Sequence, residues 1–164
     1  TASLHFDQKL INKLKKSDIK FCFVTLHVGI GTFNPIRSTN IFDHQMHSEY
    51  GEINEESAII INNTLKAGGR VIPVGTTCLR ILESVVLKEN KINPFSGYTN
   101  IFITPGYKFK IASGLITNFH LPKSSLFILV SSFVGLENAK KIYSHAIRNN
   151  YRFFSYGDGS VLLK

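Results

Sequence analysis

Short apolar, β-branched runs alternate with longer segments of helical periodicity along this chain, and this alternation limits the fold most. Residues 19–28 form a nearly continuous apolar run, which predicts a strand buried on both faces. Residues 54–67 repeat apolar side chains at helical spacing and precede two glycines, which predicts a helix that ends there. The pattern therefore predicts an α/β fold: a parallel or mixed sheet with flanking helices.

The same reasoning places the remaining elements along the chain. We expect helices over residues 7–16, 75–86, 122–133 and 137–148, and strands over 70–74, 99–104 and 151–154. A chain of 164 residues can bury the core of one domain, so residues 1–164 are treated as a single domain. The longest apolar stretch is too short to span a bilayer, and no secretion signal opens the chain, so no membrane partner is expected.

Two cysteines, Cys22 and Cys78, lie in apolar surroundings. They could form one disulfide, but buried free thiols in a reducing compartment fit the sequence better. This pattern predicts a cytoplasmic protein.

The charge of the chain favours an acidic partner, nucleic acid before anionic membrane. Lys and Arg number 19 against 11 Asp and Glu, which gives a net charge of +8. Arg148 and Arg152 lie near the aromatic residues Tyr151, Phe153 and Phe154. Those rings could stack on bases or form a core strand, and the sequence leaves both open.

An acidic, histidine-containing segment is the one metal-like feature. His44, His47 and Glu49 lie within six residues. On a strand the two histidines would point to opposite faces, so the spacing supports a metal site only weakly. A metal hydrolase, a metal-free pocket with acid and base groups, and ordinary loop residues are the alternatives at this point.

Two further segments put polar groups at predicted helix starts. Gly75-Thr76-Thr77 follows a predicted strand, and its backbone N–H groups and hydroxyls could hold an anion or ribose hydroxyls, or only cap the helix. Asn118 and His120 precede another helix and could line a pocket or serve the fold. No Walker A sequence, nucleophile-elbow serine or Cys-x-x-Cys motif is present.

Seven blocks together resemble the S-adenosylmethionine:tRNA ribosyltransferase-isomerase family of queuosine biosynthesis. They are Leu26–Arg37 (LHVGIGTFNPIR), Asp43–Glu49 (DHQMHSE), Gly68–Arg70 (GGR), Val74–Arg80 (VGTTCLR), Phe102–Gly106 (FITPG), Thr117–Pro122 (TNFHLP) and Tyr151–Asp158 (YRFFSYGD). The resemblance implies the major α/β domain of the family enzyme without its N-terminal segment and small β-barrel domain. The chain would then be an incomplete catalytic domain: a fragment, a product of a split gene with a separately encoded N-terminal half as partner, or an inactive remnant.

The resemblance also implies a reaction. Family members transfer the ribosyl part of S-adenosylmethionine to a 7-aminomethyl-7-deazaguanine at the tRNA wobble position. The products are epoxyqueuosine-tRNA, adenine and methionine, and no metal is required. By this resemblance we expect S-adenosylmethionine and tRNA as partners. The alternative is a catalytically inactive, basic tRNA-binding module.

The candidate residues follow from these blocks. A base must remove a proton beside the sulfonium, and carboxylates near a sulfonium are electrostatically favourable. We assign catalytic roles to His44, His47 and Glu49; S-adenosylmethionine contacts to Thr76, Thr77, Arg80, Asn118 and His120; and RNA contacts to Arg37, Arg148 and Arg152.

Overall fold

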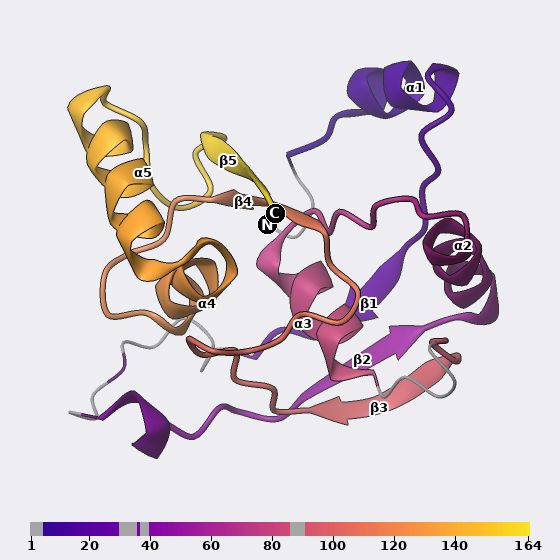
Figure 1. The fold of residues 1–164 in the computed structure, drawn as a ribbon, viewed down its shortest axis with the longest axis horizontal. Helices are drawn as coiled ribbons and strands as arrows, with labels where there is room; N and C mark the ends of the chain where they lie inside the picture. The colour runs from indigo at the N-terminus through magenta and orange to yellow at the C-terminus, as the bar shows by residue number, and fades with distance from the viewer. Residues whose placement is uncertain (1–4, 30–35, 37–39, 86–90) are drawn as a thin grey trace.

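The computed structural model describes residues 5–29, 36, 40–85 and 91–164. Its helices and strands fall into two groups on either side of helix α3 (Figure 1). The helices are α1 (Gln8–Lys16), α2 (Glu55–Lys66), α3 (Thr76–Ser84), α4 (Ser125–Val134) and α5 (Leu136–Arg148), with a 3-10 turn η2 (Ile41–Asp43). The strands are β1 (Val24–Leu26), β2 (Glu49–Ile53), β3 (Phe95–Thr99), β4 (Gly114–Asn118) and β5 (Gly159–Leu163).

The strands form two antiparallel sheets. Strands β1, β2 and β3 pair in that order, with Gly51 of β2 opposite both Leu26 and Gly97. Strands β4 and β5 form the second sheet, with Asn118 opposite Gly159. The α/β class is confirmed, but parallel pairing within the described ranges is limited to two isolated bridges between residues 71–74 and residues 112–116.

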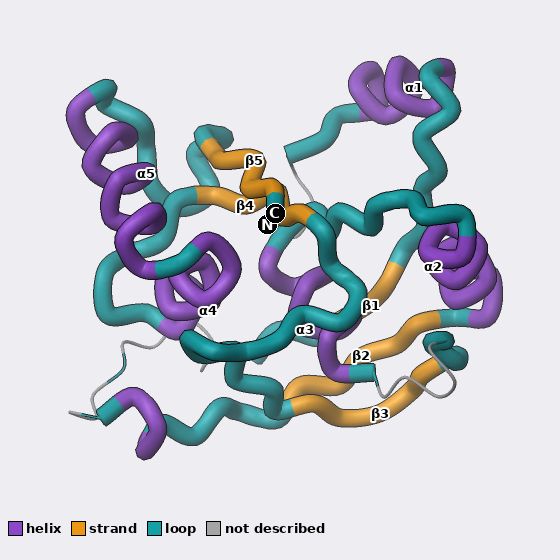
Figure 2. The backbone as a smooth tube through the Cα atoms, in the orientation of Figure 1, coloured by secondary structure: helices purple, strands orange, loops and turns teal. Residues whose placement is uncertain are grey.

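Helix α3 joins the two hydrophobic clusters of the core. Its Leu79 belongs to the cluster formed with β4, α4 and α5, whereas Ile81 and Leu82 belong to the cluster under the three-stranded sheet and α2. Figure 2 shows α3 between these two groups of elements. The start of α3 is therefore fixed from both sides by packing, which suits a segment that must hold polar groups in place.

The prediction of a strand buried on both faces over residues 19–28 is wrong. Only Val24–Leu26 joins the sheet, and it pairs with β2 alone, as an edge strand. Phe23 is 73% exposed and Ile19 is 50% exposed. An apolar run does not by itself distinguish an edge strand from a central one, because both are rich in β-branched residues.

Three other predicted strands differ from the structure. Residues 70–74 form no strand and make only isolated bridges at Val71 and Val74. The strand predicted over residues 99–104 lies earlier, and its last residue, Thr99, pairs with Glu49. Ser96 and Gly97 hid this strand, because neither favours β structure. Residues 151–154 form no strand: Tyr151 and Phe153 pack their rings around Phe119 instead. The last strand is β5 (Gly159–Leu163).

Most predicted helices are confirmed, and the reason is local. The Asp7 carboxylate accepts the Leu10 N–H at 2.6 Å, and the Asn54 side chain accepts the Ser57 N–H at 2.8 Å. Each side chain satisfies a backbone donor that the first turn leaves free. Helix α4 begins three residues later than predicted, because Ser124 rather than a residue beside Pro122 accepts its first N–H group.

No helix within the described ranges has the length and apolar character needed to cross a membrane. Cys22 and Cys78 form no disulfide with each other, and both are half-buried. Burial, and secondarily the neighbouring Cys78, raises the pKa of the Cys22 thiol.

Candidate functional site

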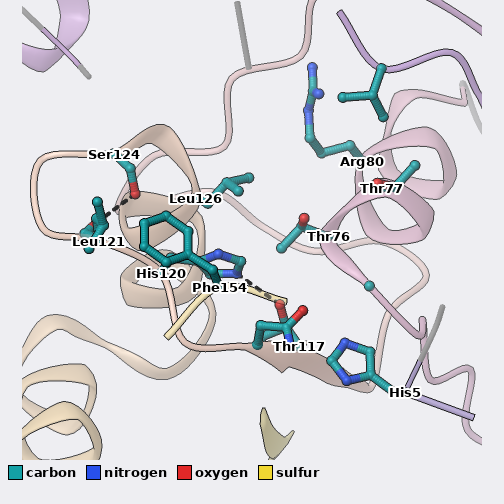
Figure 3. Close-up of a pocket in the computed structure, with 13 residues that line it drawn as sticks. His5, Thr76, Thr77, Arg80, Thr117, His120, Leu121, Ser124, Leu126 and Phe154 are labelled. Carbon is teal, nitrogen blue, oxygen red and sulfur yellow. Dashed lines mark hydrogen bonds between the residues drawn. The ribbon is translucent and has the colours of Figure 1, made fainter. Parts of the chain in front are cut away.

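A pocket lies where the start of α3 meets the end of β4 (Figure 3). Its volume is about 130 Å³. It brings together two segments that the sequence singled out separately, one at the start of α3 and the other at the end of β4. Its lining comprises His5, Val28, Gly75, Thr76, Thr77, Arg80, Thr117, Asn118, His120, Leu121, Ser124, Leu126 and Phe154.

Arg80 is the pocket's buried charge. Arg80 is 3% exposed and Glu49 is 2% exposed. The Nη1 atom of Arg80 donates a hydrogen bond to the Oε2 atom of Glu49. The other carboxylate oxygen of Glu49 accepts the Gly29 N–H at 2.9 Å. Glu49 therefore holds the guanidinium in place, and such a pair needs further hydrogen bonds to offset its desolvation.

Two donors of Arg80 remain open. Within the part of the chain that the structure describes, its Nε and Nη2 atoms have no hydrogen-bond partner. An unsatisfied buried donor costs about 1–3 kcal/mol, more when it is charged. Gly75 ends the turn before α3 without a side-chain cap, so the first backbone N–H groups of this helix also lack a capping side chain. The first residues of α3 line the pocket, so their N–H groups could donate to a carboxylate, a phosphate or a hydroxyl group, whereas the two Arg80 nitrogens are buried.

His120 lies on the other side of the pocket and is held by two hydrogen bonds. Its Nε2 atom lies 2.9 Å from the Oγ1 atom of Thr117, and its backbone N–H donates to the Tyr143 hydroxyl at 3.0 Å. Burial, with a smaller contribution from His5, lowers the pKa of His120 from 6.5 to about 4. The imidazole is therefore neutral near pH 7. Burial also raises the pKa of Tyr143 to about 12, so its hydroxyl stays protonated.

Asn118 links the pocket to the turn near the end of the chain. Its side-chain amide donates to the backbone carbonyl of Asp158 at 3.0 Å. Five of the predicted site residues thus surround one pocket: Thr76, Thr77, Arg80, Asn118 and His120. Glu49 does not line the pocket, but it forms an ion pair with Arg80, which does.

The two histidines of the acidic segment do not line this pocket. His44 is half-buried with its ring against Phe102, at 5.2 Å between centroids, and His47 is exposed. No group of three or more His, Cys, Asp or Glu side chains within the described ranges could hold a metal ion. His44, His47 and Glu49, all described, therefore form no such cluster.

The three arginines proposed for RNA contact differ in their surroundings. Arg37 lies outside the described residues. Arg148 is exposed on the last turn of α5, where its Nε atom donates to the Ser144 carbonyl at 3.2 Å. Arg152 is paired with Asp158, at 3.0 Å from Nε to Oδ2 and 3.2 Å from Nη2 to Oδ1.

Sequence reasoning missed several pocket residues. His5 and Ser124 stand far from one another in the sequence and carry no shared motif. Phe154 was named in the sequence as an aromatic residue that could stack on bases, but it was not assigned to this site. Thr117 directly precedes Asn118 in the same polar segment, and this position could have identified it as a pocket residue. The sequence also did not predict that Glu83 is buried. This residue is 1% exposed and does not line the pocket.

The lowered pKa of His120 predicts a pH dependence of stability. Between pH 6.5 and pH 4 the unfolded chain binds a proton at this residue and the folded chain does not. The free energy of unfolding therefore falls as the pH falls through this window, by about 3 kcal/mol in total. Urea unfolding at pH 7, 6, 5 and 4 measures it. His120→Gln should show a shallower decline than the wild type, and parallel curves would contradict the assignment.

The chain is similar to known proteins over nearly its whole length. A family model described as "Queuosine biosynthesis protein" matches residues 1–162. A relative from Zymomonas mobilis named "S-adenosylmethionine:tRNA ribosyltransferase-isomerase" is 54% identical over 163 residues, which cover 99% of this chain and 48% of the relative. A relative of the same name from Caulobacter vibrioides is 51% identical, and the match covers 100% of this chain and 45% of the relative.

A solved structure agrees with the sequence comparisons. The crystal structure of an S-adenosylmethionine tRNA ribosyltransferase from Thermotoga maritima superimposes with a TM-score of 0.80 at 35% identity. The match covers 99% of this chain and 51% of that chain. The chain thus spans about half the length of the relatives it matches.

Proposed function

Because this chain belongs to the family of queuosine biosynthesis proteins, we propose that its pocket binds S-adenosylmethionine as a ribosyl donor. The relatives it matches bear the name S-adenosylmethionine:tRNA ribosyltransferase-isomerase. One observation carries the proposal: the double-threonine start of α3, the buried guanidinium of Arg80 and the Asn118–His120 segment line a single pocket.

The proposed reaction makes specific demands on this pocket. The ribosyl part of S-adenosylmethionine is transferred to a 7-aminomethyl-7-deazaguanine at the tRNA wobble position and rearranges to an epoxycyclopentanediol. A proton leaves the carbon beside the sulfonium, and adenine and methionine are released. The pocket must therefore tolerate a positive sulfonium, bind the polar parts of the substrate and supply a proton acceptor.

The pocket's charges fit a sulfonium ligand. His120 is neutral near pH 7 because its pKa is lowered to about 4, so it does not repel a cation. The charge of Arg80 is balanced by Glu49, and we propose that its unpaired Nε and Nη2 atoms, which are buried in this structure, donate to the carboxylate of the methionine part when the ligand is bound. Thr76 and Thr77 add hydroxyls and the start of a helix, which suit ribose hydroxyls or the same carboxylate.

The roles assigned to individual residues follow from these positions. We give His120 the role of proton acceptor, because its neutral imidazole lines the pocket beside the end of β4 and is held there by Thr117. His5 is the other imidazole in the described lining, and no hydrogen bond to Thr117 fixes its ring. Glu49 becomes a positioning residue that orients Arg80 rather than the base. His44 and His47 lie outside the lining, so no chemical step is given to them.

The tRNA is proposed to bind across the basic part of the surface. Ten of the chain's basic side chains lie in residues 83–164, against four acidic ones. Arg148 is exposed there and available to a phosphate, whereas Arg152 is already held by Asp158. An inactive tRNA-binding module remains an outcome of the test below.

The experiment is release of adenine from S-adenosylmethionine in the presence of tRNA that carries the modified wobble base. Because the chain spans about half the length of its relatives, it is assayed alone and together with the remainder of a relative's chain. We expect release that requires the modified base and that falls at least about 100-fold in His120→Gln, the range of general acid–base catalysis. Transfer RNA with an unmodified guanine is the control. Salt-sensitive tRNA binding without adenine release would favour the inactive module instead.

A further inference from the structure

We infer that Phe154 is the platform on which a purine-type nucleobase stacks at the mouth of the pocket, an inference that rests on the proposed function. Phe154 lines the pocket and is nevertheless 53% exposed (Figure 3). Its neighbour Phe153 packs on Phe119 in the core, as Tyr151 also does. The ring of Phe154 therefore does not complete the core, and its position needs another explanation.

The backbone at Phe154 is strained. Its φ angle is +62°, and the other described non-glycine residues with positive φ are Asp18, Lys123 and Asn150. Asparagine and aspartate tolerate this conformation, whereas a bulky aromatic residue there is an outlier. Strain of this kind persists where the surrounding structure fixes it, and it concentrates at ligand sites.

The surroundings do fix Phe154 in place. Its N–H donates to the Phe119 carbonyl at 3.0 Å. The turn that follows it is tied by Asp158, whose carboxylate accepts the Arg152 backbone N–H at 2.6 Å as well as the guanidinium. The Asp158 carbonyl in turn accepts the amide of Asn118, a residue of the pocket. The ring is thus held at the pocket rather than left to move with a free loop.

The ring of Phe154 is one of several apolar side chains that line the pocket and are only partly covered. Val28, Leu121 and Phe154 line it while remaining 40%, 46% and 53% exposed. A pocket of about 130 Å³ is smaller than the roughly 300–1,000 Å³ that encloses a whole drug-sized ligand, so part of the substrate must lie at the mouth. The adenine base is the flat, aromatic part of S-adenosylmethionine, and aromatic side chains stack on the faces of bases.

The chain contains no tryptophan, so a single tryptophan can report on stacking. Phe154→Trp is titrated with adenosine, with 7-aminomethyl-7-deazaguanine and with methionine, and its fluorescence is followed. We expect saturable quenching with at least one of the two bases and none with methionine. Quenching by adenosine assigns the platform to the base of S-adenosylmethionine, and quenching by the deazaguanine assigns it to the base of the tRNA.

Matched variants separate stacking from folding. Tyr156→Trp is the control, because Tyr156 lies in the same turn, is 67% exposed and does not line the pocket. The fluorescence of this variant should not change when either base is added. Phe154→Gly removes the ring and relieves the positive φ, so we expect an unchanged or higher Tm together with a 5- to 150-fold weaker affinity for whichever base quenches Phe154→Trp.

Two failures are distinguishable. If the wild type binds S-adenosylmethionine, Phe154→Gly binds it equally well and Phe154→Trp is silent toward both bases, the stacking inference is wrong and the proposed function stands. If the wild type binds no S-adenosylmethionine by calorimetry, the proposed function fails first, and the inference falls with it.

Discussion

Replacement of Glu83 by glutamine is expected to lower the free energy of unfolding by about 3–5 kcal/mol. The Glu83 carboxylate is buried and accepts the backbone N–H groups of Lys110, Ile111 and Ala112 at 2.8, 3.1 and 2.9 Å. Its Oε2 atom also accepts the Tyr107 hydroxyl at 3.2 Å. An amide nitrogen in place of one oxygen would face donors with another donor, in a site closed to water.

Urea unfolding of the variant and the wild type measures the change. Glu137→Gln is the matched control, because Glu137 is exposed on α5 and pairs with Lys140 on the surface. Its loss should cost less than about 1 kcal/mol. Equal losses for the two substitutions would show that the buried carboxylate does not fix the segment before β4 to α3.

Replacement of Glu49 by glutamine is expected to cost a similar amount, about 3–5 kcal/mol. The reason is different: the substitution leaves the Arg80 guanidinium charged and 3% exposed without its carboxylate. The Glu49→Gln/Arg80→Met double variant removes the buried charge as well. It should recover more than half of the lost stability, because an uncharged side chain has no charge to desolvate.

The double variant also separates folding from binding. It should unfold cooperatively near the wild-type urea midpoint and yet bind S-adenosylmethionine more weakly, because the open donors of Arg80 are gone. A single variant as stable as the wild type would contradict the account of this pair. A double variant as unstable as the single one would do the same.

The sequence correctly predicted those parts of the fold that depend on interactions between residues close together in the chain. The carboxylate of Asp7 and the amide of Asn54 begin helices by bonding to N–H groups three residues away, and both are visible in a short window of sequence. Strand limits were predicted less well, because pairing across the sheet sets them. Thr99 ends β3 because β2 begins at Glu49, and no local pattern carries that information.

The site shows the same division. The double-threonine turn and the segment from Asn118 to His120 were identified as polar groups at helix starts and by family resemblance, and the fold brings them to one pocket. The pairing of Arg80 with Glu49 joins residues 31 positions apart and could not be derived from spacing. Glu83 follows Leu79 by four residues and so lies on the same face of α3. A carboxylate on this apolar face was the sequence feature that could have predicted its burial.

Calorimetric titration of S-adenosylmethionine into the purified 164-residue chain tests the account most directly. The wild type should bind one molecule per chain, and Thr76→Trp, whose ring would fill the pocket at the start of α3, should bind none while it still unfolds cooperatively. No binding by the wild type, or equal affinity in Thr76→Trp, would contradict the claim that this pocket receives the sulfonium substrate.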